Sequence, residues 1–326
     1  MQKVQRSRSW LYAVVTVFAQ FLASGALAQS YPNKPVNIVL GSAAGGGNDT
    51  ITRLIAPKLS EYLGQPVVIE NRPGASGSIA AERVAKSPAD GYTLILLSNN
   101  AVIVSMLRTL PFDLERDFAP VSQVTFASMV LVVHPSVPAS NVKELIALAR
   151  SRPGKLNYGS DSVGSAAHLA GELFHSMAKI RLVHVPYKGA PAAVMATATG
   201  ETSMNIPSIT TALPLLGAGK LRALAVTSAK RASSLPSIPT IDESGVPGYD
   251  YGVWYGMLAP AAVPKDILAQ LNAAVIKAVN TPGMKESINK IGQEPQTSSP
   301  AQFAAFMRSE IAKFAKLTKL AGLKAE

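Results

Sequence analysis

Residues 36–64 constrain the fold of this chain more than any other stretch, because three local signals follow one another there. Residues 36–40 are mostly valine, isoleucine and leucine, which predicts a buried strand. A turn with four glycines follows over residues 41–47. Asn48 or Asp49 is then expected to cap a helix. The apolar face of that helix comprises Ile51, Leu54, Ile55, Leu59 and Leu63.

A glycine-rich turn between a strand and a helix predicts an anion-binding site. Free backbone N–H groups and the positive end of the helix dipole point at one spot, so no charged side chain is needed. A nucleotide P-loop is excluded, because Asn48-Asp49 stands where Lys-Ser or Lys-Thr is required. The dinucleotide fingerprint lacks its third glycine, since Thr50 takes that place. The alternative is a tight turn that merely lets the helix pack on the sheet.

The N-terminus predicts an export signal. Lys3, Arg6 and Arg8 precede a mostly apolar stretch over residues 10–27, and Ala26-Leu27-Ala28 matches an A-x-A cleavage site. Residues 1–28 are therefore interpreted as a signal peptide cleaved after Ala28, with the bacterial periplasm as destination. The alternative, a retained transmembrane anchor, is disfavoured because no stop-transfer charges follow the apolar run.

Composition narrows the function classes. The chain has no cysteine, so neither disulfides nor thiolate chemistry are available. The net charge of +11 falls to +8 without residues 1–28, leaving 28 basic and 20 acidic residues. These charges are dispersed, which argues against nucleic-acid binding. A diffuse positive field favours encounter with small anions, although solubility alone also explains it.

Strands and helices alternate after the first unit, which predicts a parallel α/β sheet with right-handed crossovers. Ligands of such sheets lie beyond the C-terminal ends of the strands. Ser42 ends one predicted strand and Ser98-Asn99 end another, so these residues are expected to border one cleft. The predicted elements of this part are a strand at 66–70, a turn at 71–77, a helix at 78–86 and a strand at 92–97.

A second strand, Gly/Ser loop and helix repeats the first arrangement at residues 156–158, 159–165 and 166–178. The extended apolar segment 121–134 is interpreted as a crossing into another domain, and residues 249–259 as the return. The predicted domains are residues 29–127 with 255–326, and residues 128–254. Two lobes that each offer a helix N-terminus form a pincer around a small anion.

The remaining chain predicts further strands and helices of the same two domains. Strands are expected at residues 183–185, 204–206 and 221–226, and a helix at residues 210–216. In the tail, Asp266 is expected to cap one helix and Ser299-Pro300 to open another.

No catalytic or metal centre is predicted. The four histidines form neither a His-x-x-x-His nor a His-Glu-x-x-His pattern, so a zinc site is not expected. Ser162 does not fit Gly-x-Ser-x-Gly, and a hydrolase with His168 as its base stays only a distant alternative. No cofactor is expected, and the protein is interpreted as a non-enzyme.

Many spaced stretches of the chain resemble one family, the Bug-type receptors, which are periplasmic solute-binding proteins of tripartite tricarboxylate transporters. The resemblance covers essentially the whole mature chain. It is carried by YPNKPVNIVLGSAAGGGND, LGQPVVIENRPGASG, SPADGYTLILLSNN, LNYGSDSVGSAAHLAGELF and HVPYKGAPAAV, among others. It implies an α/β, two-domain periplasmic binding protein of type II-like clamshell form with two hinge crossings. It also implies capture of a small organic acid and its delivery to a membrane permease.

The resemblance also implies the ligand contacts, mainly main-chain N–H groups of two loops. Carried over by position, the first loop contributes Ala43, Ala44, Gly46, Asn48 and Asp49, and the second contributes Ser160, Ser162, Gly164, Ser165 and His168. Other side chains of the cleft are expected to select the acid: Ser98, Asn99, Tyr187, Lys188, Ser208 and Trp254.

Two departures from the family pattern bear on the ligand. Gly41-Ser42 stands where Pro-Phe is common, and Pro207 stands where many members have an acidic residue. Loss of an acid that could pair with an amino group favours a plain mono- or dicarboxylate over an amino acid, and an aromatic acid is one candidate. A sensor for a membrane histidine kinase and an envelope esterase are the alternative functions. Closure is expected about residues 125–131 and 251–258, in a monomer.

Overall fold

The computed structural model describes residues 31–42, 44–74 and 77–323. The predicted signal peptide, its cleavage site and Ala43 of the first loop lie outside the described residues. The chain forms two units, Met1–Asn33 and Lys34–Glu326, and the second contains all the helices and strands discussed below. No helix of the described part has the length and apolar character needed to cross a membrane.

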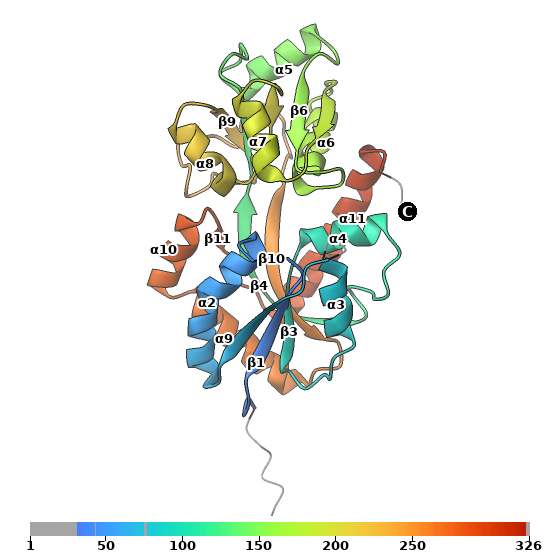
Figure 1. The fold of residues 1–326 in the computed structure, drawn as a ribbon, viewed down its shortest axis with the longest axis vertical. Coiled ribbons are helices and arrows are strands. Elements are labelled where there is room, and N and C mark those ends of the chain that lie inside the picture. The colour runs from blue at the N-terminus through green and yellow to red at the C-terminus, as the bar shows by residue number, and fades with distance from the viewer. Residues whose placement is uncertain (1–30, 43, 75–76, 324–326) are drawn as a thin grey trace, which may run out of the picture. The chain divides into compact units, whose positions relative to one another are not determined.

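The order of strands and helices follows the alternation expected from the sequence (Figure 1). The strands are β1 (Val36–Leu40), β2 (Val67–Asn71), β3 (Thr93–Ser98), β4 (Phe118–Ser128), β5 (Val130–Val133), β6 (Asn157–Ser160), β7 (Val183–Pro186), β8 (Met204–Asn205), β9 (Arg222–Val226), β10 (Gly252–Pro260) and β11 (Glu294–Pro295). The helices are α2 (Gly47–Leu63), α3 (Ser78–Ala85), α4 (Asn99–Leu107), α5 (Val142–Ser151), α6 (Ala166–Met177), α7 (Ala190–Ala198), α8 (Ile209–Gly217), α9 (Lys265–Val279), α10 (Pro282–Lys290) and α11 (Pro300–Leu320).

The strands form two sheets, which we call the sheets of lobe 1 and lobe 2. The lobe 1 sheet has six strands in the order β11-β4-β10-β3-β1-β2, and the lobe 2 sheet has five in the order β7-β6-β8-β5-β9. The expected α/β fold with two lobes is therefore confirmed. The sheets are mixed rather than purely parallel. In lobe 1, β10 returns from the other lobe and pairs antiparallel with both β3 and β4.

Two neighbouring strands carry the chain between the lobes (Figure 1). Strand β4 ends at Ser128, and β5 of the other sheet begins two residues later at Val130. On the return, β10 pairs with β4 from Gly252 opposite Ser128 onwards. Because all four residues of β5 and most of β10 are buried, both crossings lie in the interior of the unit.

Helix starts differ from the sequence expectation in two places. Helix α2 begins at Gly47 after the N-cap Gly46, so neither Asn48 nor Asp49 caps it. Helix α9 begins after Pro264, which leaves Asp266 in the first turn rather than at the cap. In both helices the acidic residue lies in the first turn, where its negative charge interacts favourably with the positive end of the helix dipole. Helices α4 and α10 were not predicted.

Candidate ligand-binding site

A cavity of about 420 Å³ lies between the two lobes. Strand ends and helix starts of both sheets meet there, as expected for ligand sites of α/β proteins. Lobe 1 lines it with Ser42, Gly46, Gly47, Asn48, Ser98, Asn99, Asn100, Val253 and Tyr255. The other side consists of Met129, Asp161, Ala166, Ala167, Ala190, Ala193, Val194, Asn205, Pro207 and Ser208.

Five helices begin at this cavity. Helices α2 and α4 contribute residues of their first turns from lobe 1, and α6, α7 and α8 contribute their first residues or N-cap from lobe 2. The first N–H groups of a helix have no partner within it, and the helix dipole adds positive potential at the same end. No lysine, arginine or histidine is among the described lining residues. The positive potential of the cavity therefore comes from the backbone.

Two buried asparagines line the cavity with polar atoms that have no partner in the described part of the chain. Asn205 is 1% exposed, and neither its Nδ2 nor its Oδ1 is hydrogen-bonded. Asn99 is fully buried and donates Nδ2–H to the carbonyl of Gly252 at 2.9 Å, but its Oδ1 has no partner. An unpartnered buried polar group costs about 1–3 kcal/mol. These amides are therefore placed to pair with a polar ligand.

Asp49 organises the first loop from within. Its carboxylate accepts hydrogen bonds from Arg53 Nε at 2.9 Å, from the Gly45 N–H at 2.9 Å and from Asn71 Nδ2 at 3.0 Å. The hydrogen bond from Arg53 is the main reason why the pKa of Asp49 falls to about 2. The side chain does not line the cavity. Asp49 thus holds the turn that presents Gly46 and Gly47.

The second loop is supported by a partly buried group that we call the histidine cluster: His168 and His175 beside Glu172, with His184 stacked on His168. The Gly164 N–H donates to His168 Nδ1 at 3.0 Å, and the rings of His168 and His184 stack with centroids 3.8 Å apart. Burial opposes ionisation of Glu172, but hydrogen bonds from His168, His175 and Tyr158 hold its pKa well below the usual range. The cluster therefore fixes the loop conformation rather than contacting the cavity.

No hydrolase arrangement is found around the serines of this loop in the described chain. Ser160 Oγ lies 2.6 Å from Nε2 of His184, not of His168, and is also bonded to the Ser162 carbonyl at 2.9 Å. Ser160 is fully buried and does not line the cavity. Its hydroxyl is consequently closed off from any ester in the cleft.

The histidine cluster predicts that acid destabilises the protein. Burial, followed by the neighbouring His168, lowers the pKa of His184 from 6.5 to about 4. Between these values the unfolded chain binds more protons than the folded chain, so the free energy of unfolding falls as the pH decreases. His175 acts in the opposite sense, because its hydrogen bond to Glu172 raises its pKa. With solvent screening, we expect His184 to cost about 1 kcal/mol at pH 5.

Thermal unfolding of His184→Phe at pH 7.5 and pH 5 measures this contribution. Phenylalanine keeps a ring beside His168 but does not titrate, so the fall in Tm between the two pH values should shrink by about 2 °C. His134→Gln, outside the cluster, is the control. An unchanged fall in Tm in His184→Phe would show that His184 does not titrate as described.

The structure brings six of the residues expected from the sequence to the cavity, namely Ser42, Gly46, Asn48, Ser98, Asn99 and Ser208. The others described do not line it: Ala44, Asp49, Ser160, Ser162, Gly164, Ser165, His168 and Lys188. Ser165 is the N-cap of α6 and accepts from the His168 N–H. Tyr187 bonds Glu201, and Trp254 is fully buried with its Nε1–H donated to Glu310. The expectation that Trp254 borders the cleft is therefore wrong, and Tyr187 does not line the cavity.

Sequence reasoning missed four polar cavity residues, Asn100, Asn205, Asp161 and Tyr255. The sequence contains an indication of Asn205, because it is the one polar residue in the predicted strand 204–206. Asp161 lies inside the predicted second loop and is the only charged side chain among the described lining residues. Nothing in the sequence indicated that Tyr255 lines the cavity, since an aromatic residue in an apolar crossing strand is typical of a core.

Two lobes joined by two crossings around a ligand cavity define a solute-binding receptor of the periplasmic type. A family model described as "Tripartite tricarboxylate transporter family receptor" matches residues 51–323. The chain belongs to this family, which confirms the family expected from the sequence motifs.

Individual relatives agree with this assignment. Protein BugT of Bordetella pertussis is 33% identical over 319 residues, which are 96% of this chain and 98% of BugT. The structure of R. palustris Rpa4515 with adipate is 39% identical, with a TM-score of 0.79, and the match covers 91% of this chain and 100% of that one. MatC (Rpa3494) from Rhodopseudomonas palustris with bound malate is 30% identical, with a TM-score of 0.73 and coverage of 88% and 99%.

Proposed function

We propose that this receptor captures a small organic carboxylate in the cavity between its lobes and delivers it to the membrane permease of a tripartite transporter. The convergence of five helix starts with the unpartnered amides of Asn205 and Asn99 carries the proposal. Backbone N–H groups and helix dipoles favour an anion, and the amides satisfy its oxygens. The relatives with adipate and malate support a carboxylate as the anion.

Closure of the lobes on the ligand is the proposed signal to the permease. A carboxylate that reaches both lobes at once binds the closed form better than the open form, and this difference in affinity drives closure. The crossings at residues 125–131 and 251–258 serve as hinges in this proposal, with lobe boundaries at residues 127/128 and 254/255. The mature receptor works in the periplasm as a monomer after cleavage behind Ala28.

The first experiment is a thermal-shift screen of residues 29–326 against acetate, longer monocarboxylates, dicarboxylates and amino acids, followed by calorimetry. A ligand that binds only the folded state at a hundredfold excess over Kd raises the free energy of unfolding by about 2.7 kcal/mol. We expect carboxylates to raise Tm and uncharged amides of the same acids to leave it unchanged. No shift with any carboxylate would contradict the proposal.

Asp161 distinguishes a plain carboxylate from an amino acid. Its charge opposes an anion in the cavity, so Asp161→Asn should lower the Kd of a plain carboxylate roughly fivefold, or about 1 kcal/mol. An α-amino acid would instead lose a partner for its ammonium group, and its Kd would rise. Calorimetry on this variant, with exposed Asp266→Asn as a control of equal net charge, measures the difference. A higher Kd for every carboxylate in Asp161→Asn would contradict the expectation.

A further inference from the structure

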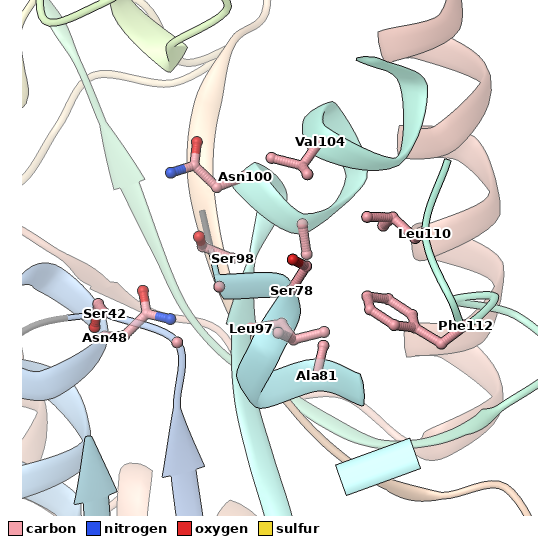
Figure 2. A pocket seen from close by; sticks show the side chains of 13 residues that line it. Ser42, Asn48, Ser78, Ala81, Leu97, Ser98, Asn100, Val104, Leu110 and Phe112 are labelled. Carbon is pink, nitrogen blue, oxygen red and sulfur yellow. The ribbon is translucent and has the colours of Figure 1, made fainter. Parts of the chain in front are cut away.

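A second cavity, of about 190 Å³, adjoins the binding site inside lobe 1 (Figure 2). The two cavities share four polar lining residues, Ser42, Asn48, Ser98 and Asn100. Figure 2 shows Ser42 and Asn48 on one side of this space and Val104, Leu110 and Phe112 on the opposite side. We call it the side cavity. All its described lining residues belong to lobe 1, so it extends the binding site into that lobe.

The part of the side cavity that is not shared is mainly apolar. Leu97, Val104, Leu110 and Phe112 line it together with Ala81 and Ala101. Leu97 is 4% exposed and Phe112 is 7% exposed, so these walls belong to the core of the lobe. No acidic or basic side chain is among its described lining residues. A charged group that entered it would find no counter-charge.

Small residues create this space. Gly41, Ser42, Gly77, Ser78, Ala81 and Ala101 all face it, from the first loop, the start of α3 and the start of α4. The backbones of Gly41 and Gly77 approach so closely that a Cβ on Gly41 would lie 2.5 Å from Gly77 Cα. The wall at this point is therefore main chain. An apolar cavity of about 150 Å³ is large enough to admit benzene, so the side cavity has room for a group of that size.

We infer that the ligand is a monocarboxylate with an apolar body about the size of a benzene ring, whose body occupies the side cavity while its carboxylate meets the helix starts. The inference rests on the proposed function. Apolar walls stabilise an aryl or alkyl body, at about fourfold in affinity for each buried methylene. A second carboxylate that reached the apolar far wall, formed by Leu110 and Phe112, would lose its hydration without gaining a counter-charge. The side cavity thus selects monocarboxylates against dicarboxylates.

Matched ligands test this inference on the wild-type protein by calorimetry. Phenylacetate and hexanoate separate an aromatic from an aliphatic body, adipate adds a second carboxylate to a six-carbon chain, and acetate probes the carboxylate end alone. We expect phenylacetate or hexanoate to bind at least fiftyfold more tightly than both acetate and adipate. Adipate binding as tightly as hexanoate and phenylacetate would overturn the inference and leave the proposed function standing. Failure of all carboxylates would overturn both.

Ala101→Leu fills the side cavity and supplies an internal test. We expect it to weaken binding of phenylacetate and hexanoate at least tenfold while acetate binding stays within twofold. Ala85→Leu is the matched control, since Ala85 also packs half-buried against the core but lies outside the cavity lining. If Ala101→Leu does not fold, Leu110→Asn replaces it, and the ratio of adipate to hexanoate affinity should rise at least tenfold. Unchanged ligand preference in the variant that folds would overturn the inference.

Discussion

Asn205→Leu is expected to make the protein more stable and at the same time nearly unable to bind its ligand. The amide of Asn205 is buried in the cavity with both polar atoms unpartnered, so leucine of similar size removes a desolvation cost. We expect the free energy of unfolding to rise by about 1 kcal/mol. The ligand loses the amide that pairs with it, and we expect Kd to rise about a hundredfold, or roughly 3 kcal/mol. Opposite signs of the two changes are typical of a residue kept for function.

Denaturant unfolding and calorimetry with the best carboxylate of the screen measure both quantities. Asn289→Leu is the matched control, because Asn289 Oδ1 also has no partner but the residue lies in α10, outside the cavity lining. The control should leave Kd unchanged. If Asn205→Leu binds the ligand as tightly as the wild type, Asn205 does not contact it and the ligand lies elsewhere in the cleft.

Gly47→Ala is expected to weaken ligand binding at least tenfold although alanine favours helices. Gly47 is the first residue of α2, and alanine is more favourable than glycine in helices, by about 0.5–1 kcal/mol in a helix interior. A Cβ at this position would lie 2.2 Å from Tyr255 Oη, inside contact distance. Tyr255 is 9% exposed, and burial raises the pKa of its hydroxyl to about 12. The methyl group must therefore displace either this cavity wall or the start of α2.

A double-mutant cycle with Tyr255→Phe identifies the clash as the cause. Removing the hydroxyl relieves the shortest contact, so Gly47→Ala should cost less affinity in the Tyr255→Phe background than alone. Gly283→Ala in the first turn of α10 is the control, since a Cβ there meets no atom within 4 Å. Equal losses in both backgrounds would show that Tyr255 is not the group displaced.

The local units of the fold could be predicted because each is encoded in adjacent residues. The apolar run 36–40 and the glycine turn before α2 specify a strand, a loop and a helix start without distant contacts. The second loop, which precedes α6, could be predicted for the same reason. Helix α4 was missed because its first residues, Asn99 and Asn100, read as the polar end of the preceding strand. Its apolar residues then fail to form one stripe.

Roles within the loops depended on contacts that local patterns do not show. Asp49 and His168 lie in predicted binding loops, yet both are buried beside partners that support those loops. Asp49 meets Asn71 from the next strand, and His168 stacks on His184 from β7. Such partners come from strand pairing across the sheet. The sequence therefore locates the loops but not which of their side chains face the ligand.

By itself, the sequence determined the two strand–loop–helix units and the family. It also predicted an anionic ligand, because backbone N–H groups at a helix start follow from local geometry. Tertiary structure alone decided that five helix starts meet at one cavity and that Asn205 faces it unpartnered. It also decided that an apolar cavity adjoins them. These features depend on pairing between strands far apart in the chain, such as β10 between β3 and β4, and on the space left by packing.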